Sequence, residues 1–356
     1  MVFLLIICNF NFQFRIHMSK KILVVGAGFS GSVIARILCE NGYQVDIIDK
    51  RSHIAGNAFD YLNQHNILVH QYGPHLFHTS NQSVFEFLSR FTEWVDYQHR
   101  VKAILENGEL VTLPVNLETK NKVGEEKVID TFVRPYSEKM WGMKLEEISP
   151  DIINRVPIRN DYNELYFPDD KFQAMPKLGY TKLFENILNH PNIHVTLEKA
   201  FDKDMEEQYM HVFNSMPIDE YYDYCLGPLP YRSLKFHHVD LPIPRIFPVC
   251  QVNFTNNGPY TRVVEWKNIP NSPQNPQYTS LTYEEPCSSV DNNNERFYPV
   301  KDASGKNREL YLQYKQIDNP KTTFIGRLGQ YVYLDMHQVV SSSMAIAEKF
   351  IKANSL

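Results

Sequence analysis

The chain has 356 residues, of which 43% are hydrophobic and 22% charged, and its formal net charge is −5 at neutral pH. This length allows a sizeable core in two or three joined domains, and the composition is typical of a globular protein. The negative charge excludes a global basic field for nucleic acid or an anionic membrane, so an anionic ligand needs a local group of arginines. The five cysteines are widely spaced, which fits neither a disulfide framework nor a zinc site and favours a reducing cytoplasm.

Residues 1–17 precede the first predicted strand. Met1 to Cys8 are apolar, but this stretch lacks a basic region and a small-residue cleavage site, and it is too short to span a bilayer. Because Met18 lies just before the strand, we interpret residues 1–17 as a disordered extension or the product of an upstream start codon. We expect no stable membrane insertion.

A dinucleotide-binding motif follows. The apolar run Lys21 to Val25 leads into a G-x-G-x-x-G loop made by Gly26, Gly28 and Gly31, and this loop opens a helical pattern. The three glycines allow a tight turn, a close approach to a pyrophosphate and close helix–strand packing, while the helix directs its N-terminal amides at the phosphates. Asp49 ends the next predicted strand, where its carboxylate is placed to accept a hydrogen bond from a ribose hydroxyl.

The segment after Asp49 favours FAD over NAD. A nicotinamide-binding domain usually continues with another helix and a third parallel strand. Here a second glycine-containing loop, residues 52–57, and an aromatic and histidine-rich stretch, residues 61–78, follow instead. An extended flavin needs contacts along more of its length, so this arrangement suits FAD.

The middle of the chain predicts insertions into this domain. Residues 81–91 and 128–140 have the periodicity of amphipathic helices. Residues 181–188 predict another helix and residues 193–197 a short strand. From residue 231 to 314, β-branched and aromatic residues alternate with Pro, Asn and Gly, which is typical of antiparallel strands.

The C-terminal part returns to the pattern of a dinucleotide fold, with a strand over residues 322–325, a loop over 326–335 and a closing helix over 338–351. The sequence therefore predicts an α/β protein with a discontinuous Rossmann-like FAD-binding domain, an inserted helical domain and an antiparallel β-sheet domain. The expected bounds are residues 18–79, 206–236 and 315–356 for the FAD-binding domain, 80–150 for the helical domain, and 151–205 with 237–314 for the β-sheet substrate domain.

Short motifs are spread along the chain from about Lys20 to Ile351. They are Gly26–Gly31, His53–Asn57, His70–His78, Lys139–Gly142, Arg155–Arg159, Met175–Thr181, Tyr231–Leu234, Pro259–Arg262, Gly326–Gly329 and Tyr331–Met336. Together they resemble the motifs of the UDP-galactopyranose mutase family of the bacterial type. Agreement at so many separated places extends the resemblance over nearly the whole chain.

The resemblance implies an isomerase, formally an intramolecular transferase, that converts UDP-galactopyranose to UDP-galactofuranose for cell-wall polysaccharide or lipopolysaccharide biosynthesis. In this family FAD is active when reduced: its N5 is the nucleophile, a covalent flavin–sugar adduct forms, and no net redox change occurs. The chain has no G-x-S-x-G motif and no cysteine in a recognisable catalytic setting, which agrees with a cofactor that carries the chemistry.

The resemblance also assigns residues to the substrate. Arg155 is similar to the arginine on the family's mobile loop, Arg262 to its fixed partner and His53 to a histidine near the flavin, and these three form the expected catalytic group. Guanidinium groups suit a diphosphate because they donate bidentate hydrogen bonds and stay charged. The residues expected to bind substrate are Phe132, Tyr136, Trp141, Arg155, Tyr166, Arg232, Arg262, Tyr298 and Tyr333.

A second set is expected to bind FAD. Its members are Gly26, Gly28, Phe29, Ser30, Gly31, Asp49, Lys50, His53, Gly56, Asn57, His75, Arg327, Tyr333, Asp335 and Met336. We predict no metal site, because His75 and His78 lack a compact third and fourth ligand beyond His70. The expected partners are the two UDP-galactose isomers and a second copy of the chain in a homodimer, with no nucleic acid.

Two residues depart from the family's pattern. Ala55 stands where a glycine is usual, so we expect restricted φ in the flavin loop. Val133 stands where a second aromatic residue is common, which predicts weaker stacking on uracil.

Two other functions remain open at this point. A flavin-dependent amine or alcohol oxidoreductase shares the N-terminal motif and would show net flavin reduction by its substrate. A non-catalytic binder of flavin or sugar nucleotides would keep the motif and lose the arginines and tyrosines.

Overall fold

The computed structural model describes residues 20–354, so the extension expected over residues 1–17 lies outside the described residues. A five-stranded sheet in which every pairing is parallel contains the dinucleotide loop. Its strand order is β10 (Ile193–Thr196), β2 (Gln44–Ile48), β1 (Lys21–Val25), β11 (His211–Asn214) and β17 (Thr322–Phe324).

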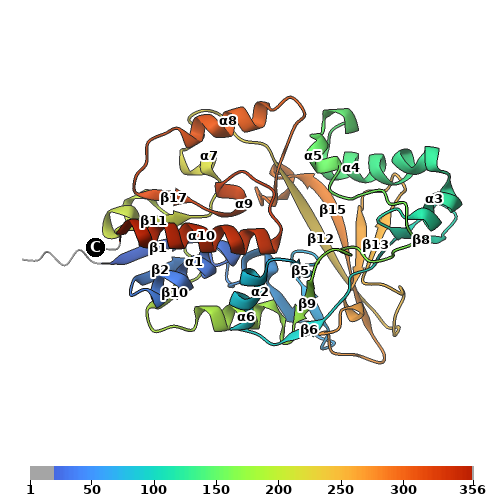
Figure 1. Ribbon diagram of the computed structural model, residues 1–356, viewed down its shortest axis with the longest axis horizontal. Helices are drawn as coiled ribbons and strands as arrows, with labels where there is room; N and C mark the ends of the chain where they lie inside the picture. The colour runs from blue at the N-terminus through green and yellow to red at the C-terminus, as the bar shows by residue number, and fades with distance from the viewer. Residues whose placement is uncertain (1–19, 355–356) are drawn as a thin grey trace, which may run out of the picture.

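The apolar run of β1 explains its central place in this sheet. Ile22, Leu23 and Val24 have no exposed surface, as expected for a parallel strand that is covered on both faces. Figure 1 shows α1 (Phe29–Glu40) and α10 (Met336–Asn354) lying together against this sheet. The predicted discontinuous Rossmann-like domain is therefore confirmed, because strands far apart in the sequence build one parallel sheet.

A seven-stranded sheet forms the second large layer. Its order is β16 (Tyr298–Pro299), β12 (Tyr231–Leu241), β15 (Thr279–Ser288), β14 (Arg262–Glu265), β13 (Gln251–Phe254), β7 (Val101–Ile104) and β8 (Leu110–Leu113). Its pairs are antiparallel except for β13 with β7, which is parallel. The antiparallel strands predicted over residues 231–314 are present as far as Pro299, but the end of that range forms α8 (Lys306–Lys315) instead. The sheet is also wider than expected, because β7 and β8 join it.

Three strand placements correct the expected domain division. β7 and β8 fall inside the segment assigned to the helical domain, yet they pair with β13 and extend the seven-stranded sheet. β10 falls inside the segment assigned to the substrate domain, yet it pairs with β2 in the parallel sheet. Strand pairing joins residues that are distant in sequence, so local patterns could not show which sheet each strand completes. The other domain bounds stay a prediction.

The remaining strands form two small sheets. One has the order β5 (Phe77–Thr79), β9 (Phe172–Pro176) and β6 (Trp94–Asp96), and the other pairs β3 (Asp60–Leu62) with β4 (Leu68–His70). The remaining helices are α2 (Gln82–Ser89), α3 (Leu117–Val123), α4 (Arg134–Trp141), α5 (Pro150–Ile153), α6 (Gly179–Leu188), α7 (Ile218–Tyr221), α8 (Lys306–Lys315) and α9 (Gly326–Gly329). In Figure 1, α3, α4 and α5 gather at one end of the seven-stranded sheet. No helix within residues 20–354 is long and apolar enough to cross a bilayer.

Local capping and periodicity account for most helix positions. The Asn81 side chain accepts a hydrogen bond from the Val84 amide and starts α2, which confirms the helix expected there. The helix expected over residues 128–140 is present as a π-helical turn, Ile129–Val133, followed by α4. The prediction of a loop over residues 326–335 was wrong at its start, because the first four residues form α9.

Candidate functional site

A cavity of about 320 Å³ lies at the N-terminus of α1. Gly28 is the N-cap residue and makes no side-chain cap, so the amides of the first helical turn face the cavity without a competing side chain. A Cβ atom on Gly31 would lie 1.9 Å from the Gly26 carbonyl oxygen, which shows why helix and strand meet there only through glycine. The sequence prediction of a phosphate-binding turn therefore fits this geometry.

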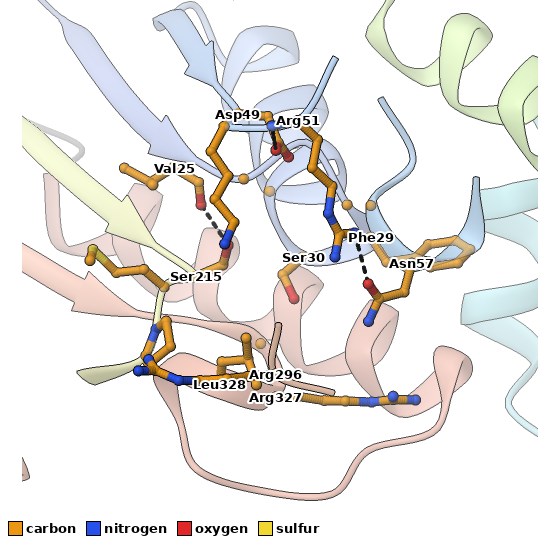
Figure 2. A pocket seen from close by; sticks show the side chains of 18 of the residues that line it. Val25, Phe29, Ser30, Asp49, Arg51, Asn57, Ser215, Arg296, Arg327 and Leu328 are labelled. Atoms are coloured by element: carbon orange, nitrogen blue, oxygen red, sulfur yellow. Dashed lines mark hydrogen bonds between the residues drawn. The ribbon is translucent and has the colours of Figure 1, made fainter. Parts of the chain in front are cut away.

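Asp49 borders the same cavity from the end of β2. Its carboxylate accepts hydrogen bonds from the Ala27 amide at 2.8 Å and the Arg51 amide at 2.9 Å. These bonds orient the side chain, and each carboxylate oxygen keeps a lone pair for a ribose hydroxyl. In Figure 2, Asp49, Arg51 and Asn57 lie on one side of the cavity, with Arg296, Arg327 and Leu328 on the other.

The second glycine loop carries the departure at Ala55. Ala55 has a φ of 71°, in the left-handed region that favours glycine, and its side chain is buried. Gly56 follows with a φ of 54°, and a Cβ there would lie 2.9 Å from the Gly28 Cα atom. The two glycine loops thus pack backbone against backbone, and Ala55 adopts the conformation that its side chain disfavours.

A second cavity, of about 500 Å³, adjoins the first. His75, Arg327 and Met336 line both cavities, so the two spaces meet at these residues. Such a junction suits an elongated cofactor whose phosphates lie at α1 and whose other end reaches the second cavity. Met336 begins α10, whose N-terminus therefore borders the junction, as expected for a helix that faces a flavin.

Arginines reach the second cavity from different elements. Arg155 lies after α5, donates to both Asp335 oxygens at 3.0 and 2.8 Å, and stacks over the Tyr333 ring at 4.0 Å. Arg262 on β14 is mostly covered, with 20% of its side chain exposed, and it donates to Glu284 at 2.7 Å and to Gln251 at 3.3 Å. Burial opposes its charge, but the Glu284 carboxylate outweighs burial and raises the pKa of Arg262, so this guanidinium stays positive.

Aromatic side chains cover much of the remaining wall of the second cavity. They come from α4 and the turn before it, from the segment that precedes β9, from β16, and from the loop that follows α9. Burial raises the pKa of Tyr136, Tyr166 and Tyr298 above the ordinary value, so their phenols stay protonated donors. Of the residues expected to bind substrate, the cavity gathers Phe132, Tyr136, Trp141, Arg155, Tyr166, Arg262, Tyr298 and Tyr333.

Two expected residues lie elsewhere. Arg232 donates to the carbonyls of Met140 and Lys139 and lines neither cavity, so it fixes the end of α4. His53 also lines neither cavity: it stacks on Phe59, donates to the Ile54 carbonyl and accepts from the Tyr72 hydroxyl. Burial lowers the pKa of His53. Both side chains are thus directed toward neighbouring protein groups, and the roles expected for them at the substrate and the flavin stay predictions.

The FAD set divides between the cavities. The first cavity is lined by Gly26, Gly28, Phe29, Ser30, Gly31, Asp49, Lys50, Gly56, Asn57, His75, Arg327 and Met336. Tyr333 and Asp335, which were expected at the cofactor, line the second cavity alone. Among residues 20–354, no group of three or more His, Cys, Asp or Glu side chains has an arrangement that could hold a metal ion.

Several lining residues escaped the sequence reasoning. Ser215, Glu220 and Arg296 line the first cavity from segments with no motif of their own. Gln251 and Asn253 line the second cavity from β13. Because side chains two residues apart on a strand point to the same face, the sequence could have placed these two residues together. Each of these residues reaches a cavity only because separate sheets come together.

The fold and the two joined cavities define a dinucleotide-dependent α/β enzyme whose cofactor site opens into a cationic, aromatic substrate site. The model for an NAD(P)-binding Rossmann-like domain matches residues 24–91, and the model for UDP-galactopyranose mutase matches residues 131–333. A probable UDP-galactopyranose mutase of Klebsiella pneumoniae is 35% identical, over 94% of this chain and 96% of that protein. The chain belongs to the UDP-galactopyranose mutase family.

Two further comparisons extend this result. A dTDP-fucopyranose mutase of Escherichia coli is 36% identical, over 94% of this chain and 99% of that protein. The crystal structure of a reduced UDP-galactopyranose mutase matches with a TM-score of 0.74 and 15% identity, over 94% of this chain and 96% of that chain, which shows the shared fold. The Rossmann-like domain and the family membership together indicate a flavin as the cofactor class and a mutase as the enzyme class.

Proposed function

We propose that this chain binds FAD and, with the flavin reduced, interconverts UDP-galactopyranose and UDP-galactofuranose. The observation that carries the proposal is the junction of the two cavities at His75, Arg327 and Met336. It lets a cofactor bound at α1 present its far end to a sugar nucleotide held by Arg155 and Arg262.

The first cavity fits FAD on its own residues. The amides at the uncapped N-terminus of α1 donate hydrogen bonds to the pyrophosphate. The close backbone contact between Gly28 and Gly56 keeps side chains out of this phosphate site. Asp49 would accept a hydrogen bond from the ribose, and the N-terminus of α10 would border the flavin end of the cofactor. When bound and reduced, FAD would supply the nucleophile for the isomerisation.

The second cavity binds the sugar nucleotide. Arg155 and Arg262 neutralise the diphosphate, and Tyr166, Tyr298 and Tyr333 donate phenolic hydrogen bonds to it. The uridine lies against Phe132, Tyr136 and Trp141, which line the cavity beside α4. Val133 lines the same wall without an aromatic ring, so uracil stacking rests on fewer rings.

The test uses purified protein with FAD under anaerobic conditions. Dithionite-reduced protein incubated with UDP-galactofuranose should yield UDP-galactopyranose by chromatography, over many turnovers for a single reduction, while oxidised protein should be nearly inactive. The denatured protein should release FAD. Equal activity of the oxidised protein, or consumption of one reductant per product, would favour the amine or alcohol oxidoreductase instead.

The dTDP-fucopyranose mutase relative supports a second candidate substrate. The same reaction run with dTDP-fucopyranose should be slower than that with the UDP sugar. A higher kcat/KM for the dTDP sugar would transfer the assignment to that substrate.

Light scattering after gel filtration tests the expected homodimer in the same preparation.

A further inference from the structure

Isomerisation moves protons, and this inference rests on the function proposed above. In forming the furanose ring, the bond between C1 and O5 breaks and the bond between C1 and O4 forms. O5 therefore gains a proton and the O4 hydroxyl loses one. For these two sugar oxygens, a single side chain that first gives and then takes a proton balances both steps, with no oxidant or reductant.

Most titratable groups of the second cavity are poorly suited to this task. Burial lowers the pKa of His75 and of His99 to about 3, so neither ring takes up a proton near neutrality. The Asp335 carboxylate is held by two hydrogen bonds from Arg155. The lining tyrosines Tyr136 and Tyr298 have raised pKa values and keep their protons.

His78 differs from these groups in its partner. It is the middle residue of β5, where Phe77 and Thr79 point into the core, so the alternation of the strand turns His78 to the opposite face. Its Nδ1 atom lies 2.6 Å from an oxygen of Asp170. A carboxylate only accepts, so Nδ1 donates this hydrogen bond.

The other ring nitrogen is available to a ligand. Nε2 of His78 makes no hydrogen bond with any residue of the described part of the chain, while the residue lines the second cavity. The ring is held flat against Phe167, with centroids 3.5 Å apart, and the edge of His337 packs at 5.2 Å. His337 follows Met336, so His78 lies near the junction of the two cavities, where the sugar is expected.

We propose that His78 is a catalytic residue that gives a proton to O5 as the pyranose ring opens and takes one from the O4 hydroxyl as the furanose ring closes, and that Asp170 positions it. Asp170 fixes the proton of the neutral ring on Nδ1, which leaves Nε2 as the atom that exchanges a proton with the sugar. His99 and His337 are the other titratable groups that face this ring, and Ser80 donates to the second Asp170 oxygen.

His78→Asn tests the proton step, with the exposed His194→Asn as the matched control. UDP-galactopyranose labelled with ¹⁸O between the anomeric carbon and the phosphate reports cleavage of that bond, because the label then scrambles among the phosphate oxygens. Scrambling needs no ring opening. In the reduced holoenzyme, His78→Asn should keep scrambling near the wild-type rate and lose isomerisation by about 10²- to 10⁴-fold.

Asp170→Asn tests the positioning role, with the adjacent exposed Asp169→Asn as its control. The asparagine amide presents an N–H to Nδ1, which moves the proton of the neutral ring to Nε2. Isomerisation should fall by at least about 10²-fold, and ¹⁵N chemical shifts of the histidine ring at alkaline pH should show the changed tautomer. The His78→Asn spectrum identifies the signal.

Three results would overturn the inference. The first is isomerisation in His78→Asn equal to that of the control, and the second is a parallel loss of scrambling and isomerisation, which would mean a binding role. The third is an unchanged tautomer in Asp170→Asn. Wild-type protein that neither scrambles nor isomerises UDP-galactopyranose would instead contradict the proposed function.

Discussion

Arg155 and Arg262 show two ways in which the same charge is held. Arg262 is mostly covered and is paired with the buried Glu284, so its position is fixed by the fold. Arg155 is 34% exposed and bonds to Asp335, a partner that also lines the cavity. A diphosphate can share the Arg155 guanidinium with the Asp335 carboxylate, because both contacts to Asp335 come from Nη2 and the group carries further N–H donors.

Replacement of Arg155 by Ala should therefore affect turnover and leave stability nearly unchanged. An exposed ion pair contributes only about 0–1 kcal/mol to folding. Loss of a cation that contacts the leaving diphosphate should lower kcat/KM by about 10²-fold or more. Steady-state kinetics and urea unfolding measure both effects, with the exposed Arg308→Ala as control. Activity within a few-fold of wild type would remove Arg155 from the diphosphate site.

Among the secondary-structure elements, α1 has two glycines at its start, Gly28 and Gly31, that we expect to affect cofactor binding and folding differently. A Cβ on Gly28 would lie 3.6 Å from the Gly56 Cα atom, an ordinary contact, but it would stand at the mouth of the phosphate cradle. A Cβ on Gly31 would lie 1.9 Å from the Gly26 oxygen and 2.8 Å from a Val24 methyl group. The first position is therefore open to Ala sterically, and the second is not.

We expect Gly28→Ala to fold with near wild-type stability and to bind FAD at least about tenfold more weakly, a cost of about 1.4 kcal/mol. Gly31→Ala should lower the free energy of unfolding, because helix and strand must separate. Calorimetric titration with FAD and urea unfolding of both variants measure the difference. Equal losses of stability in the two variants would contradict this separation.

At the scale of the whole molecule, buried histidines link stability to pH. Burial lowers the pKa of His70, His75 and His99 to about 3, from an ordinary 6.5. Between these values the unfolded chain binds more protons than the folded protein, so stability falls as pH falls below about 6.5. Each histidine should contribute about 1 kcal/mol of this loss between pH 7 and about pH 5.5.

Urea unfolding of the FAD-saturated protein at the two pH values tests this linkage. His70→Gln should reduce the pH-dependent change by about 1 kcal/mol, whatever its effect on absolute stability. The exposed His194→Gln should leave the change as in wild type. A His70→Gln variant with an unaltered pH dependence would show that His70 takes up a proton in the folded protein.

Features that depend on neighbouring residues along the chain could be predicted from the sequence. The strand, glycine loop and helix around Gly26 follow from a continuous apolar run, required glycines and helical periodicity, all of which are local. The Asn81 cap of α2 is local in the same way. The arginines and tyrosines that line the second cavity were identified through the family resemblance, not through a local pattern.

Contacts between groups that are far apart in the chain follow from the folded arrangement and could not be predicted. His53 and Arg232 belong to well-matched motifs, yet they hydrogen-bond to Tyr72 and to the end of α4 and line neither cavity. His78 meets Asp170 across 92 residues of sequence because β5 pairs with β9. Strand pairing and burial act between segments that share no local pattern, so the partner of each side chain, and with it the chemistry of the site, was set by the fold.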